Sequence, residues 1–138
     1  MAYTKKVARH DRIELDGTDY SNAFNAFGFN SADTQVDASG FSVTGVDENL
    51  PGPRAQGFTG TMFVTEETLS GVFPMHNARS IVQVYWQPNG LVDTTAPAFW
   101  ADCYILEFSP ADTRGDVSTT TFTAVTATET GIQTAAGT

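Results

Sequence analysis

The stretch Phe99-Trp-Ala-Asp-Cys-Tyr-Ile-Leu-Glu-Phe108 decides the fold, because it is the most apolar window of the chain. Both of its alternating faces are largely apolar, which is typical of a strand in the middle of a sheet. Further windows with period-two alternation lie at residues 58–64, 80–86 and 117–128, and a less regular window covers residues 19–30. Threonine, glycine, aromatic and β-branched residues dominate these windows and favour strands. The sequence therefore predicts an all-β domain, a sandwich or small barrel.

The alternation also predicts which side chains share a face of the sheet. Val82, Val84 and Trp86 are expected on one face of their strand, and Phe122 is expected to share a face with Ala124. In the less regular window, Phe24 is expected on the face opposite Phe27, and Gly28 is a candidate position for a bulge.

Two acids of the central window, Asp102 and Glu107, lie five positions apart, an odd spacing. A regular strand would place them on opposite faces. They are therefore not expected to form a glycosidase pair by themselves, since such a pair flanks one bond.

One short helix is predicted over residues 66–78, flanking the sheet. A threonine suited to the N-cap and two first-turn acids precede apolar residues at helical spacing. Gly71 and Pro74 interrupt the segment, so a short or kinked helix is expected. The residues of this pattern are Thr65, Glu66, Glu67, Leu69, Val72 and Phe73.

The charge of the chain is unevenly distributed. Its 138 residues are the length of one domain and carry a formal charge of −9. Four of the seven cations, Lys5, Lys6, Arg9 and Arg12, lie in the first twelve residues beside one acid, so that segment is +3 and the remainder is −12. A body this acidic does not bind nucleic acid by neutralising phosphates. Net negative charge is also an ordinary route to solubility, so the charge alone leaves both interpretations open.

Residues 36–56 form a long, acidic segment broken by glycine and proline. Phe41, Val43 and Val46 alternate inside it, and Leu50 adds a further apolar point. A long excursion from a small domain usually has a function, and the alternation predicts a β-hairpin arm that docks on a partner. We divide the chain into an N-terminal arm (1–14), a β-sandwich body (15–130) that carries this hairpin, and a C-terminal tail (131–138).

No catalytic, metal or cofactor site is predicted. His10 and His76 have no second ligand at metal spacing, and Cys103 lies in the most apolar window, as a buried hydrophobe would. Asp47-Glu48 could hold a hard cation, but no calcium-loop motif surrounds the pair. We expect no enzyme activity, no secretory signal and no membrane segment.

An ordered series of short motifs resembles a known family. The series is Ala32-Asp33-Thr34, the arm closing in Pro51-Gly52-Pro53-Arg54, the strand Gly57-Phe-Thr-Gly-Thr-Met-Phe63, the short helix, Val84-Tyr85-Trp86, and Ser109-Pro-Ala-Asp-Thr-Arg-Gly-Asp116 before a threonine-rich strand. Over about residues 15–133 this resembles the tail tube (major tail) protein of long-tailed, non-contractile bacteriophages and related viruses.

The resemblance implies a subunit that forms six-membered rings stacked into a hollow tube. The tube would enclose a tape-measure protein, meet tail terminator and distal tail proteins, and let DNA pass without specific binding. The protein would be part of the virion tail, assembled in the host cytoplasm without a membrane or cofactor. Six copies of a chain at −9 would carry −54 per ring.

The interface expected between copies combines the basic arm with the hairpin arm, and two acids are expected to face the lumen. The interface residues are Lys5, Lys6, Arg9, Arg12, Phe41, Val43, Val46, Asp47, Glu48, Leu50, Pro51 and Arg54, and the lumen acids are Asp102 and Glu107. Two alternatives remain open. One is a capsid decoration protein or other virion β-sandwich, and the other is a carbohydrate-binding module using Trp86 and Trp100.

Overall fold

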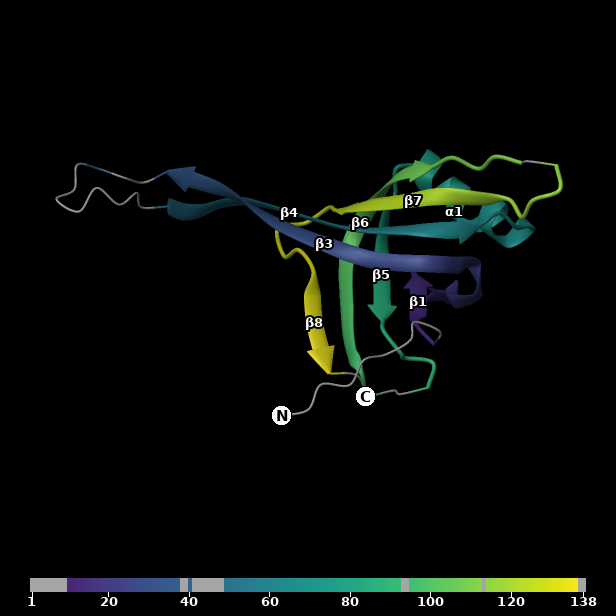
Figure 1. Cartoon of the computed structure of the whole chain (residues 1–138), viewed down its shortest axis with the longest axis horizontal. Coiled ribbons are helices and arrows are strands. Elements are labelled where there is room, and N and C mark those ends of the chain that lie inside the picture. Colours follow the sequence, from purple (N-terminus) through teal and green to yellow (C-terminus); the bar gives the residue numbers. More distant parts are fainter. Residues whose placement is uncertain (1–9, 38–39, 41–48, 93–94, 113, 137–138) are drawn as a thin grey trace.

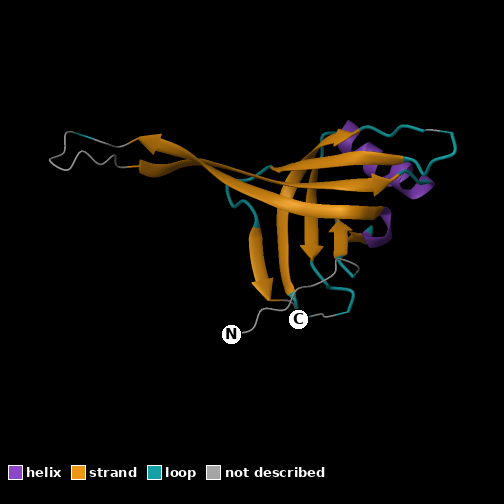
Figure 2. Ribbon diagram, in the orientation of Figure 1, coloured by secondary structure: helices purple, strands orange, loops and turns teal. Residues whose placement is uncertain are grey.

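The computed structural model describes residues 10–37, 40, 49–92, 95–112 and 114–136. Eight strands and one α-helix follow one another, which confirms the predicted all-β class with a single short helix (Figure 2). The elements are β1 (Arg12–Leu15), β2 (Thr18–Asp19), a 3-10 turn (Ser21–Ala23), β3 (Phe24–Asp37), β4 (Asn49–Phe63), α1 (Glu66–Asn77), β5 (Ile81–Gln87), β6 (Pro97–Phe108), β7 (Thr119–Thr126) and β8 (Gln133–Ala136).

All strand pairs are antiparallel, in the order β2-β1-β5-β6-β7-β4-β3, with β8 also pairing with β6. The sheet bends so that β3, β4 and β7 cross over β1, β5 and β6 as a second layer (Figure 1). Aromatic side chains contact one another between the layers. The ring centroids are 5.8 Å apart for Phe27 and Trp86 and 4.8 Å apart for Phe29 and Phe99. The most apolar window of the sequence is β6, and it occupies the predicted central position.

The core lies between the two layers, where apolar side chains of nearly every strand meet. Val82 and Val84 are fully buried, and Phe122 and Ala124 share the opposing buried face, as the alternation predicted. The remaining core members include Leu15, Phe58, Met62, Cys103, Ile105 and Phe108.

A bulge in β3 overturns one prediction about faces. The pairing with β4 shifts by one residue between Phe24 and Ala26, not at Gly28. The extra residue brings Phe24 and Phe27 to the same face, where their rings lie 5.0 Å apart against the core. The prediction that these two phenylalanines face opposite ways is therefore wrong.

A second bulge, in β6, overturns the prediction for the two acids. Ile105 pairs with Ala124, whereas Glu107 pairs with Thr123, so Leu106 is the extra residue. Beyond Leu106 the inward-facing and outward-facing positions of β6 are exchanged, so the side chain of Phe108 is buried in the core. Asp102 and Glu107 are both exposed and share the outer face of the sheet, so placing them on opposite faces was wrong.

Helix α1 runs over Glu66–Asn77, close to its predicted bounds, and contains Pro74. Thr65 is the N-cap as predicted, in a capping box with Thr68. The predicted apolar stripe is only partly correct. Thr68 and Val72 are buried, whereas Leu69 and Phe73 remain almost half exposed.

Both ends of the predicted body extend further than expected. Residues 12–14, assigned to the N-terminal arm, lie in β1 and pair with β5, and much of the predicted tail forms β8 against β6. The hairpin β1–β2 turns at Asp16-Gly17, where both residues have positive φ. An Asp-Gly pair between short strands is a strong hairpin signal, and our sequence interpretation missed it.

Candidate assembly interface

The hairpin of β3 and β4 continues well beyond the body. Pairing of β4 with β7 ends at Gly57, opposite Val125, whereas β3 and β4 stay paired as far as Asp37 and Asn49. The eight residues from Asn30 to Asp37 span roughly 24 Å as a strand. We call residues 31–37 and 49–56 the arm, and it projects from one side of the body (Figure 1). The described part of the predicted hairpin is thereby confirmed.

An ion pair joins the two strands of the arm near its base. Arg54 Nε donates to Asp33 Oδ1 at 2.6 Å and its Nη2 donates to Asp33 Oδ2 at 3.3 Å. The hydrogen bond from Arg54 holds the pKa of Asp33 below its ordinary value. Arg54, expected at an interface between copies, is therefore already engaged within its own chain.

The side chain of Gln56 fastens the arm to the C-terminal part of the body. Its Nε2 donates to Ser31 Oγ and its Oε1 accepts from the Ile132 amide, each at 2.9 Å. Gly131 has φ +65°, and a Cβ there would lie 2.3 Å from Gln56 Oε1. Glycine at 131 thus permits the close approach that fixes where the arm leaves the body.

Two apolar side chains near the far end of the described arm have no core to pack against. Val36 and Leu50 are Cα partners across the hairpin, 45% and 51% exposed. Pro51, the neighbour of Leu50, is also exposed. An exposed apolar pair held on a projecting arm is typical of a surface that is covered in an assembly.

Strand β3 also leaves an edge open. Among the described residues it pairs only with β4, and it ends the strand order. An unpaired edge of this length can accept a strand from another chain.

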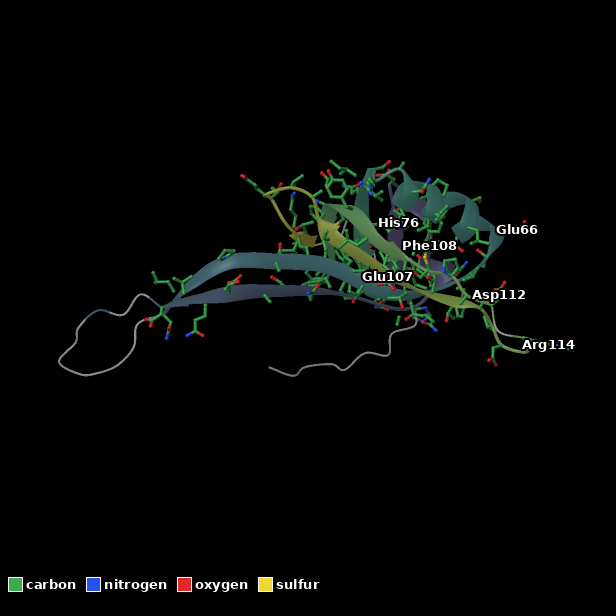
Figure 3. All side chains as sticks on the ribbon, turned by 90° about the horizontal axis from the view of Figure 1, so that it is seen from above. Glu66, His76, Glu107, Phe108, Asp112 and Arg114 are labelled. Atoms are coloured by element: carbon green, nitrogen blue, oxygen red, sulfur yellow. The ribbon has the colours of Figure 1, made fainter. Side chains whose placement is uncertain are left out.

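The outer face of β3, β4 and β7 is built from small uncharged residues. Thr59 lies opposite Thr123 and Thr61 opposite Thr121, and none of these four side chains is buried. Glu107 of β6 borders this face as the cross-strand partner of Thr123 (Figure 3). Asp102 lies further back along β6, opposite Gln83.

A hollow of about 650 Å³ lies where α1 meets β6, and no pattern in the sequence indicated it. Its lining includes Tyr104, Leu106, Arg79 and His76. His76 Nδ1 donates to the Ile105 carbonyl at 2.8 Å, on a stretch of β6 that β5 no longer pairs. Leu106 is 56% exposed because the bulge turns it outward.

The other predicted residues fall into three groups. Arg12 lies in β1, where its Nε pairs with Glu14 Oε2 at 3.1 Å. Trp86 pairs with Phe99 and Trp100 with Tyr85, so the two indoles occupy opposite faces of the sheet and form no joint platform. Eight expected residues lie outside the described part of the chain, namely Lys5, Lys6, Arg9, Phe41, Val43, Val46, Asp47 and Glu48.

The described residues contain no cluster of three or more His, Cys, Asp or Glu side chains that could hold a metal ion. Cys103 is buried, and desolvation raises the pKa of its thiol to about 12. Within the same residues, no helix has the length and apolar character to span a membrane.

Comparison with solved structures shows that this fold occurs in particles with tails. The chain superimposes on a subunit of the virion of a native gene transfer agent with a TM-score of 0.77, at 13% identity over 96% of this chain and all of the other. For the tail of an empty gene transfer agent particle with C6 symmetry the score is 0.67, at 15% identity over 91% and 94% of the chains.

For the SPP1 tail tube the TM-score is 0.66, at 11% identity over 92% and 77% of the chains. No protein-family model matches the chain, and no curated protein matches it either. At these identities the comparisons show a shared fold, which is that of tail tube subunits.

Proposed function

We propose that this chain is a virion structural protein, the subunit of a viral tail tube. It assembles into six-membered rings that stack around a tape-measure protein and form a conduit for genome delivery. The observation that carries the proposal is the arm, which projects from a two-layer body and ends in an apolar pair that its own chain leaves exposed. The C6 symmetry of one structural relative supports six copies per ring.

The free edge of β3 supports ring formation. A contact between two different surfaces of the same subunit closes a ring when its rotation closes, and strand pairing at the edge of β3 removes an open edge from each copy. The layer of β1, β5 and β6 packs against one side of β3, β4 and β7 only. Because that layer would fill the bore if it faced inward, the bore is surfaced by the uncovered threonine face.

Charge on this bore comes from Glu107 beside the threonines, whereas Asp102 lies further along β6, opposite Gln83 of the other layer. Hydroxyls with a minority of acids offer no cations to phosphates, so DNA passes without being held. The basic N-terminal segment then meets acidic protein surface on a neighbouring copy. Tail terminator and distal tail proteins close the two ends, and the tail assembles in the host cytoplasm.

The arm is proposed to join successive rings, and a shortened chain tests this. Asp33 and Arg54 are Cα partners, so residues 34–53 can be replaced by Asn-Gly, a two-residue hairpin turn that suits the register. The shortened protein is expected to keep its fold and its melting temperature but to form no tubes in electron micrographs. The full-length protein, purified in parallel, is expected to form tubes with six-fold symmetry.

Two results would contradict the proposal. Tubes formed by the shortened protein would remove the arm from the stacking contact. Failure of the full-length protein to form rings or tubes over a wide range of concentration and salt would remove the tail tube function. No feature of the described residues favours a carbohydrate-binding module, since the two tryptophans face opposite ways.

A further inference from the structure

The hollow between α1 and β6 has the composition of a docking socket. We define the socket as Arg79, Tyr104 and Leu106, which line the hollow, with Ile81, the Cα partner of Tyr104. Ile81 and Leu106 are each more than half exposed, and Tyr104 is partly exposed. Bulges redirect side chains at functional positions, and here the bulge places Leu106 outside the fold.

Arg79 stands in a backbone conformation that suits glycine. It follows α1 with φ +54°. Arg79 and Ser80 donate backbone hydrogen bonds to the carbonyls of His76 and Met75, the pattern of a helix end that usually has glycine in the left-handed position. Glycine at position 79 would adopt this backbone conformation with less strain and would give a more stable fold. The presence of an arginine there therefore indicates a role for its side chain.

The charge of the socket is opposite to that of the chain as a whole. No described carboxylate forms an ion pair with Arg79, whereas Arg12 and Arg54 each have one. His76 uses Nδ1 for the Ile105 carbonyl, and its ring is half-buried beside Arg79 in the same hollow. An acidic segment that also presents apolar side chains would complement such a surface.

We propose that the socket receives the arm of a second copy of this chain. The exposed pair Val36 and Leu50 supplies the apolar side chains. By sequence, residues 36–56 contain three acids against one cation, Arg54, and that cation is engaged by Asp33. The arm therefore offers apolar side chains to the exposed Ile81 and Leu106 and net negative charge to Arg79.

The occupant is a second copy because the arm of the same chain points elsewhere. His76 lies in the last turn of α1, and Figure 3 shows it over the body with the arm directed away from it. Because the arm and the socket are different surfaces, two joined copies still have a free arm at one end of the pair and a free socket at the other. Further copies can therefore add at both ends, and the contact repeats along a filament. This inference rests on the proposed tail tube and names the surface that the arm contacts.

Crosslinking in the full-length chain tests the contact directly. We would combine Leu50→Cys with Leu106→Cys, assemble the protein and add a short bismaleimide. Cys103 stays silent because it is buried and its pKa is about 12. A ladder of covalent multimers is expected. Leu50→Cys combined with Leu91→Cys, a site that is 50% exposed and outside the socket, is the matched control and is expected to give no ladder.

Electron microscopy of the same samples separates the two proposals. Tubes with a ladder support both. Tubes with no ladder from Leu50→Cys/Leu106→Cys, or with an equal ladder from the control, overturn the docking and leave the tube standing. A ladder without tubes supports the docking and overturns the tube. The absence of both overturns both.

Substitution of Arg79 gives an independent readout. Arg79→Gly is expected to raise the melting temperature of the monomer, since it relieves the positive φ, and to raise the critical concentration for assembly about tenfold, as for loss of an interface arginine. Arg79→Lys keeps the charge and should assemble more readily than Arg79→Gly. Arg114→Gly removes an exposed cation elsewhere and should leave assembly unchanged. Normal assembly of Arg79→Gly would overturn the socket.

Discussion

At the scale of single residues, Gly71 shows why a poor helix former can be required within a helix. A Cβ at this position would lie 2.3 Å from the hydroxyl oxygen of Tyr20 and 3.4 Å from its Cζ atom. Tyr20 belongs to the core, and burial raises the pKa of its hydroxyl, with Glu67 contributing. The glycine therefore makes room for a phenol that closes the core at α1.

We expect Gly71→Ala to lower the free energy of unfolding, although alanine is the better helix former. Overpacking costs about 1–3 kcal/mol, and the helix gains about 1 kcal/mol, so the net loss is about 1 kcal/mol by urea denaturation. In a Tyr20→Phe background the clashing oxygen is absent, and the same substitution should be stabilising. An unchanged sign in that background would show that the hydroxyl is not the obstacle.

The sequence identified Gly71 as an interruption of the helix but gave no reason for it. Tyr20 lies about fifty positions away and meets the helix only in the folded chain, so local propensity cannot reveal the contact. Arg79 is a similar case. The end of the helix was predicted, whereas the left-handed conformation of an arginine there follows from the hydrogen bonds of the folded turn.

At the scale of elements, the bulge in β6 predicts that one residue of a core strand can be deleted. Removing Leu106 would align Glu107 with Thr123 and Phe108 with Phe122 without a shift, because those are their partners already. We expect this deletion to cost about 1 kcal/mol or less in urea denaturation, the range of a surface change, while assembly is lost with the socket.

The matched control removes Gln83 from β5, which has no bulge against β6. That deletion moves the side chains on one side of the deleted position to the opposite face of the sheet, so that Val82 or Val84 leaves the core. It should cost more than about 4 kcal/mol or prevent folding. If both deletions lowered the free energy of unfolding equally, Leu106 would not be an extra residue that β6 can lose without changing its pairing.

Alternation gave the faces of strands correctly wherever the ladder is regular. It placed Val82 with Val84 and Phe122 with Ala124, and their burial confirms this. It failed for Phe27 and for Glu107, each of which lies beyond a bulge. A bulge is a mismatch between two strands, so it cannot be found from one strand alone. For the same reason the arm was predictable as a hairpin, whereas the socket, made by a bulge and a distant helix end, was not.

At the scale of the whole molecule, the net charge governs how copies meet. Each chain carries −9, so neighbours repel over distances that salt shortens. We expect the critical concentration for assembly to fall as sodium chloride rises from about 10 to 150 mM, where the Debye length drops from about 30 to 8 Å. Light scattering would measure it, with sucrose of equal osmolality as the control. A critical concentration that rises with salt would show that attraction between charges dominates assembly.

The sequence predicted the class of fold and the existence of an arm, but not which edges of the sheet stay open. Edge strands are defined by strand order, and the order here places β3 last although it is the third strand along the chain. That arrangement depends on β7 pairing with β4 and β6 from far along the sequence. Which strand edges stay open to another chain is therefore a property of topology that composition and periodicity do not encode.

Strands β3 and β4 pass from the body into the arm without interruption, and this has a mechanical consequence. A pull on the end of the arm acts along the strands, while their hydrogen bonds lie across them. The bonds between β3, β4 and β7 would then be loaded together, in shear, and none would be peeled open singly. A fibre of such subunits would resist stretching strongly, and bending would be accommodated at the joints between neighbours.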